Sequence, residues 1–239
     1  MNKSTLLCFT SLILAAAMLA ACSSGSPAVA TESPATEGAS TTAPVPAATS
    51  MPGQPAASGS GELTLSIVSA ESEARFIIDE VLAGSPNTVI GTTRDVQGEI
   101  RVDPGNLDGA SISPIAIGAG SLTTDNNFRN RAIGNFILQT GDYPTITFTP
   151  EEIDGLPAST SVGDALSFQV AGQLTIRDIT QPITFTVSVK VESESRISGA
   201  AQATIQRGDF DLSIPSVPQV ASVSEQVQLE LDFVATTGS

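Results

Sequence analysis

Three stretches of the chain alternate apolar and polar residues with a period of two, and this pattern constrains the fold more than any other feature. They are "ALSFQVAGQLTI" (165–176), "ITFTVSVKV" (183–191) and residues 226–233. Successive side chains of a β-strand point to opposite faces, so each stretch predicts a strand with one dry face and one wet face. The apolar positions on the dry faces are Leu166, Phe168, Val170, Leu174, Ile176, Ile183, Phe185, Val187, Val189, Val191, Val227, Leu229, Leu231 and Phe233.

The rest of the chain from residue 62 onward continues this pattern. Further strands are predicted at residues 62–68, 74–81, 96–102, 109–116, 145–149 and 197–206, which makes eight or nine strands in sequential antiparallel order. Residues 103–106 (Asp-Pro-Gly-Asn) read as a hairpin turn. Long strands joined by short turns favour a closed barrel, because closure leaves no exposed edge. We therefore predict an all-β, antiparallel barrel.

Alternation alone does not say which face points inward. In a transmembrane barrel the apolar face would meet lipid, but such barrels carry aromatic girdles, and this chain has no Trp and one Tyr. We therefore place the apolar face inside. An eight-stranded barrel is then either filled by its own side chains or holds one small ligand, and the pattern leaves both possibilities open.

The amino-terminal segment predicts export. Residues 1–21 carry one basic residue, Lys3, and then an apolar run, which is typical of a signal peptide. The order Leu19-Ala20-Ala21-Cys22 is that of a bacterial lipobox, and cleavage as an ordinary signal is the alternative. Residues 22–61 are rich in Ala, Ser, Thr and Pro and predict a disordered tether. We expect three parts: a signal peptide (1–21), a tether with a lipidated Cys22 (22–61) and a barrel domain (62–239).

Composition excludes several classes of function. The formal net charge is −15, which disfavours binding to nucleic acid. The chain has no His, and loss of the signal removes Cys8 and leaves Cys22 as the one thiol, so we expect no internal disulfide, no metal site and no His-based catalysis. There is no Gly-x-Ser-x-Gly and no phosphate-binding loop. We predict a non-enzymatic protein with no cofactor.

One stretch departs from the strand pattern. In residues 123–141, Phe128, Ala132 and Phe136, with the neighbouring Ile133 and Ile137, recur at helical spacing. Thr124 or Asp125 is the expected cap, and Gly141 the expected end. A short amphipathic helix between two barrel strands predicts a plug across an open end, with Arg129 and Arg131 pointing toward the rim.

Three stretches, in this order, resemble the YceI-like family of exported, lipocalin-like barrels. They are "SLTTDNNFRNRAIGNFILQTGDYPTITF", "GQLTIRDITQPITF" and "IQRGDFDL". Three positions differ: Leu63 or Leu65 stands near the place of a Trp that is frequent in the first strand of relatives, and Asn130 and Ala132 stand where relatives commonly carry Asp and His. The resemblance implies an eight-stranded antiparallel lipocalin-like barrel with a short helical plug, holding a polyisoprenoid or related lipid in an apolar cavity.

From the pattern and the resemblance together we expect a bacterial lipoprotein that carries or sequesters such a lipid. It would be anchored at the cell envelope, on the outer face of the plasma membrane or in the outer membrane or periplasm. The acyl chains on Cys22 would be its only attachment to the membrane. Arg129 and Arg131 are candidate rim residues. The expected cavity lining is Leu65, Phe76, Phe136, Phe148, Phe168, Val170, Leu174, Phe185, Val187, Ile205, Leu229 and Phe233.

Two further expectations concern loops. Arg207 and Asp209 predict a structural ion pair at a turn. The alternative to a lipid carrier is a cell-surface interaction module with a filled β core. That module would recognise its partner through loops such as residues 84–92.

Overall fold

The computed structural model describes residues 61–216, 218 and 220–238. The predicted signal peptide, the lipidation site at Cys22 and all but the last residue of the predicted tether lie outside this range. Within the described residues, no helix is long and apolar enough to cross a membrane.

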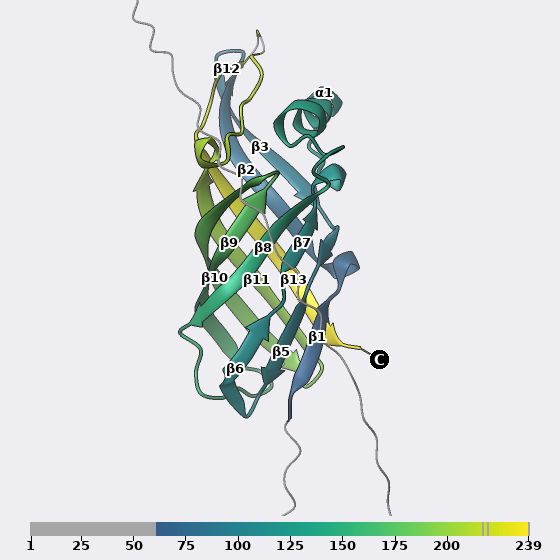
Figure 1. Ribbon diagram of the computed structural model, residues 1–239, viewed down its shortest axis with the longest axis vertical. Helices are drawn as coiled ribbons and strands as arrows, with labels where there is room; N and C mark the ends of the chain where they lie inside the picture. The colour runs from purple at the N-terminus through teal and green to yellow at the C-terminus, as the bar shows by residue number, and fades with distance from the viewer. Residues whose placement is uncertain (1–60, 217, 219, 239) are drawn as a thin grey trace, which may run out of the picture. The chain divides into compact units, whose positions relative to one another are not determined.

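The described part of the chain is a single antiparallel sheet of thirteen strand segments (Figure 1). The strands are β1 (Leu63–Ile67), β2 (Glu73–Leu82), β3 (Ser85–Thr93), β4 (Val96–Gln97), β5 (Glu99–Asp103), β6 (Asn106–Ile112), β7 (Ile115–Gly118), β8 (Thr145–Asp154), β9 (Ala165–Ile176), β10 (Ile179–Ser193), β11 (Arg196–Gln206), β12 (Val220–Val223) and β13 (Gln226–Thr237). The all-β prediction is confirmed.

Several of these segments are parts of one longer strand. β1 and β2 are separated by one 3₁₀ turn, η1 (Ser69–Glu71), and together lie between β13 and the run β3–β4–β5. The run β3–β4–β5 is broken only at residues 94–95 and at Gly98. β6 and β7 are separated by residues 113–114, where Pro114 lacks an N–H to donate. Joined in this way, the segments other than β12 form eight strands.

These eight strands close into a ring. The run β6–β7 pairs with β5 and β4 on one side and with β8 on the other. From β8 the order continues through β9, β10, β11 and β13, and β13 returns to β1 and β2. Every pairing is antiparallel. The ring is the predicted barrel, and short breaks in its strands account for the larger number of segments.

The strand pattern was predicted correctly at most positions, with two omissions, β3 and the short β12. Residues 85–93 form strand β3, paired along its length with β2. The region that the interaction-module alternative used as a loop, residues 84–92, is therefore mostly a strand in the barrel wall. The turn predicted at residues 103–106 is confirmed, because Asp103 and Asn106 are paired across it.

Four short helical elements accompany η1 within the described residues: η2 (Ala119–Ser121), α1 (Asn127–Ala132), the π-helical turn η3 (Ile133–Ile137) and η4 (Arg207–Phe210). α1 and η3 follow each other directly and form what we call the helical segment. The segment lies at the end of the barrel that also carries β12 (Figure 1).

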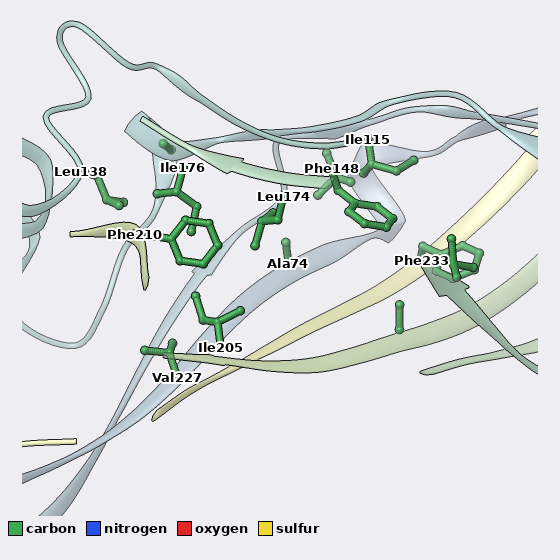
Figure 2. Packing of buried hydrophobic residues seen from close by; sticks show 14 of the residues in the cluster. Ala74, Ile115, Leu138, Phe148, Leu174, Ile176, Ile205, Phe210, Val227 and Phe233 are labelled. Carbon is green, nitrogen blue, oxygen red and sulfur yellow. The ribbon is translucent and has the colours of Figure 1, made fainter. Parts of the chain in front are cut away.

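The core lies inside the ring. Apolar side chains from the inner faces of the strands point toward a common interior (Figure 2). Ile133 and Leu138 from the helical segment and its C-cap, and Phe210 from η4, join this cluster. Among the described residues Phe210 is the largest fully buried side chain, with 1% of its surface exposed.

Candidate functional site

The barrel encloses an apolar cavity of about 910 Å³. This volume lies at the upper end of the range of small-molecule sites. Most of the residues that line it are apolar, and they come from the inner faces of the strands. The side chains therefore do not fill the barrel completely.

The structure places eleven of the twelve predicted lining residues at the wall of this cavity. They are Leu65, Phe76, Phe148, Phe168, Val170, Leu174, Phe185, Val187, Ile205, Leu229 and Phe233. Phe148 and Phe185 contact each other edge to face, with ring centroids 4.9 Å apart and an angle of 67° between the ring planes. Such a pair stabilises both rings in fixed positions on the wall.

Two of the phenylalanine rings lie over glycines of the neighbouring strand. Phe76 is paired with Gly91, and Phe233 with Gly199. A Cβ added at Gly91 would lie 2.1 Å from the Phe76 ring, and one at Gly199 would lie 2.6 Å from the Phe233 ring. Each ring therefore occupies the space that the side chain of any residue other than glycine would take at position 91 or 199. As a result, less of the ring projects into the cavity.

The twelfth predicted lining residue, Phe136, was assigned wrongly. Its side chain is 64% exposed, and it does not line the cavity. Phe128, which the same helical stripe placed inward, is 78% exposed. The residues of this region that reach the cavity are Arg129, Ile133, Ile137 and Leu138. The inner face of the segment is thus rotated relative to the predicted stripe.

The rotation is already present in α1, where Phe128 is exposed and Arg129 lines the cavity, and the helix type then changes. α1 has only six residues, and residues 133–137 then adopt a wider π-helical turn. A strict 3.6-residue spacing therefore does not hold across the segment. The cap also differs from the prediction: Asn126, rather than Thr124 or Asp125, accepts hydrogen bonds from the backbone N–H groups of Phe128 and Arg129.

A charged pair lies at the end of the cavity nearest the helical segment. The guanidinium of Arg129 donates to the carboxylate of Glu80 at 2.9 Å and also to Asp125. The amide of Asn87 donates to the same Glu80 oxygen at 2.9 Å. Both Glu80 and Arg129 line the cavity, and the Glu80 side chain is 7% exposed. Arg129 therefore lies at the end of the cavity, between the buried Glu80 and the exposed Asp125.

Arg131 lies on the other side of the segment. It is exposed, does not line the cavity, and stacks on Phe128 with 4.7 Å between its guanidinium carbon and the ring centroid. The two predicted rim arginines thus face in different directions.

Sequence reasoning missed Glu80, although a signal was present. Glu80 continues the inner face of β2 in the same period-two phase as Ala74, Phe76 and Ile78. A carboxylate in that phase predicts a polar group inside the barrel. The cavity residues Ile100, Ile115, Ile146, Val189 and Ala201 also lie on inner strand faces.

A further arginine, Arg177, connects three elements at the same end of the barrel through hydrogen bonds. Arg177, in the turn between β9 and β10, donates to the carbonyl of Ile137 at 3.4 Å, and to those of Phe210 and Asp211 at 3.2 and 3.0 Å. One side chain therefore links the helical segment, η4 and a strand turn.

The predicted pair of Arg207 and Asp209 is wrong. Arg207 instead pairs with Glu225, and it donates to the backbone carbonyls of Ser224 and Leu212. Its role is still structural, because it joins η4 to the start of β13.

Comparison with known proteins gives one family. The family model for the YceI-like domain matches residues 65–235, which is most of the barrel. No curated protein matches the chain.

Solved structures with the same fold include three close in shape. BcnA of Burkholderia cenocepacia has a TM-score of 0.57 and 20% identity, over 71% of this chain and 99% of that one. A polyisoprenoid binding domain from Saccharophagus degradans, implicated in plant cell wall breakdown, has a TM-score of 0.57 and 18% identity, over 74% and 99%. The YCEI protein of Campylobacter jejuni has a TM-score of 0.50 and 19% identity, over 62% and 85%. At these identities the likeness establishes the fold.

Proposed function

The chain belongs to the YceI-like family, and from that premise we propose that its barrel binds a polyisoprenoid or another long-chain amphiphilic lipid, for carriage or sequestration. The observation that carries this proposal is the apolar cavity of about 910 Å³ within the ring of strands. The relative from Saccharophagus degradans, described as a polyisoprenoid binding domain, supports the choice of ligand class.

The hydrophobic effect supplies enough free energy for such binding. Burial of apolar surface is worth about 25 cal/mol per Å². A lipid tail that buries several hundred Å² therefore gains on the order of 10 kcal/mol before the costs of ordering are subtracted. The fixed aromatic rings of Phe148 and Phe185 reduce that cost on the protein side, because they are already in place.

The polar end of the ligand has one suitable place near the helical segment. Glu80 and Arg129 bring an acceptor and a donor to the cavity wall, and Asn87, which does not line the cavity, donates its amide to Glu80. Because Arg129 is already shared between Glu80 and Asp125, this end offers hydrogen bonds but little free positive charge. A head group with both donor and acceptor atoms suits it better than a pyrophosphate.

We further propose that acyl chains on Cys22 hold the protein at the bacterial cell envelope after export. The order Leu19-Ala20-Ala21-Cys22 and the apolar run before it support this attachment.

Native mass spectrometry of the full chain, purified from its own membranes, tests lipid binding. We expect a mass increment that solvent extraction releases as a long-chain lipid. Val187→Arg places a charge on the cavity wall and should abolish the increment, whereas Ser188→Arg, the next residue, lies on the exposed outer face and should leave it unchanged. If Val187→Arg does not fold, Val187→Trp replaces it in the test. The indole fills part of the cavity without adding a charge, and it should lower the lipid mass increment. A wild-type protein that carries no lipid increment releasable by solvent would refute the proposal.

A further inference from the structure

The helical segment exposes two phenylalanines. Phe128 and Phe136 are 78% and 64% exposed, and within the described residues only Ile90 and Val162 are large apolar side chains of comparable exposure. Ile90 lies on β3, two residues from Thr92, whose backbone pairs with Thr123 just before the segment. Val162 lies elsewhere, in the loop between β8 and β9, so the two most exposed large apolar side chains of the described residues both belong to this one segment.

Phe128 and Phe136 are not needed to cover the barrel interior. The inner side of the same segment is already occupied, because Ile133 and Leu138 are buried in the core and Ile137 lines the cavity. The segment is thus apolar on both sides, one facing the cavity and the other facing away from the protein.

The polar neighbour of these rings also indicates a particular partner. Arg131 stacks on Phe128 and, among the described residues, has no carboxylate partner. Arginine beside an aromatic ring is suited to phosphate oxygens at the boundary between water and acyl chains. Aromatic side chains prefer the same boundary.

We propose that Phe128, Arg131 and Phe136, which we call the docking face, seat this end of the barrel on a lipid bilayer. The inference rests on the proposed function, because it assigns the place where the ligand passes between the bilayer and the cavity. Only one short segment would separate the inserted rings from the cavity, so the lipid tail could cross with little exposure to water.

The expected attachment is weak and reversible. With a net charge of −15 the protein gains nothing from anionic lipids, so insertion of the two rings must dominate. A zwitterionic surface is therefore the appropriate membrane, and its phosphates are available to Arg131.

The absence of Trp from the sequence makes a direct test possible. Phe128→Trp and Phe136→Trp each create a single fluorescent reporter on the docking face. Ser195→Trp is the matched control, because Ser195 is exposed in the turn between β10 and β11, at the opposite end of β10 from Arg177 and the helical segment. Each full chain is reconstituted into phosphatidylcholine vesicles with brominated acyl chains.

Both docking-face reporters should shift their emission to the blue and lose about half of it or more to the bromines, while the control changes little. Phe128→Ser in the Phe136→Trp chain should weaken the quenching. Equal quenching at all three positions, or none at the docking face, would overturn the proposal. A blue shift without quenching would also overturn it, because the rings would then be buried against protein and not in the acyl chains.

The lipid measurement separates this proposal from the function on which it rests. Lipid-loaded protein with unquenched reporters would refute only the docking face. Quenched reporters on a protein that never retains lipid would support docking and refute carriage.

Discussion

At Gly91 and Gly199 the inner wall of the barrel has no side chain, and a phenylalanine from the next strand occupies each gap. The consequence concerns volume as much as stability. A glycine costs strand stability on its own, but here the space it leaves is filled by Phe76 or Phe233. Rings held against the wall in this way leave more of the interior free.

Gly91→Ala tests this arrangement. The new Cβ would meet the Phe76 ring at 2.1 Å, so the ring must move toward the cavity. We expect a loss of about 1–3 kcal/mol in the free energy of unfolding, as in other overpacked cores, together with less retained lipid. Urea unfolding and native mass spectrometry measure the two effects. Gly109→Ala is the control, because a Cβ there meets no atom within 4 Å. Equal effects of both substitutions would contradict the explanation.

Single residues show what a sequence pattern can and cannot predict. The positions of Val170 and Val187 follow from period two alone, because a strand in a wall has only two faces. Phe136 could not be placed in this way. Its direction follows from the orientation of the whole helical segment, in which Arg129 is paired with Glu80 and Phe128 is already exposed.

At the scale of elements, the strands with alternating Val, Ile, Leu and Phe were predicted well, and β3 was not. Its sequence, "SPNTVIGTT", has few large apolar residues because its inner face carries Gly91 and Thr93. Gly91 leaves the space that Phe76 occupies, so part of the signal for this strand lies in its neighbour. The helical segment was predicted to exist, but its orientation comes from contacts with Glu80 and Arg177.

Ion pairs also join elements at the start of β11. Arg196 binds both carboxylate oxygens of Glu71 in η1, at 3.3 and 2.6 Å, and its Nε donates to Glu192 at the end of β10 at 2.7 Å. The hydrogen bonds from Arg196 lower the pKa of Glu71 below its ordinary value of 4.5. Ser198, and then Arg196, lower the pKa of Glu192. The same carboxylates raise the pKa of Arg196.

These shifts predict a dependence of stability on pH. The pKa values of Glu71 and Glu192 are lower in the folded state. The two carboxylates therefore add to the free energy of unfolding above the unfolded pKa values near 4.5, and this stabilisation is lost as the pH falls through the folded pKa values. Arg196→Gln should therefore flatten the fall of unfolding free energy between about pH 6 and pH 3. Urea titrations at each pH measure this. Arg94→Gln, at an arginine 70% exposed, serves as the control.

The difference between wild type and Arg196→Gln should shrink in high salt, because the pairs are exposed to solvent. A wild-type pH profile that matches that of Arg196→Gln at low salt would show that the pairs contribute nothing to stability.

For the whole molecule, the acidic charge and the proposed anchor lead to opposite expectations about membranes. A chain of net charge −15 is repelled by anionic lipid, so electrostatics cannot hold it there. Wild-type protein should stay with the membrane in a wash of about 1 M salt, since acyl chains are indifferent to screening. Cys22→Ser should move the protein to the soluble fraction. Release of the wild type by salt, or retention of Cys22→Ser, would contradict lipidation at Cys22.

The pairing of β13 has a consequence for how the chain reaches its native state. This strand contacts β11 on one side and both β1 and β2 on the other, so it joins the two ends of the barrel sequence. Such contacts are among the most distant in the chain, and loop-closure entropy makes them slow to form. Until residues 226–237 emerge from a ribosome or a translocation channel, the ring stays open, with bare edges at β11 and at β1–β2. Delayed closure fits the export that we propose, in which the polypeptide is threaded across a membrane before it folds.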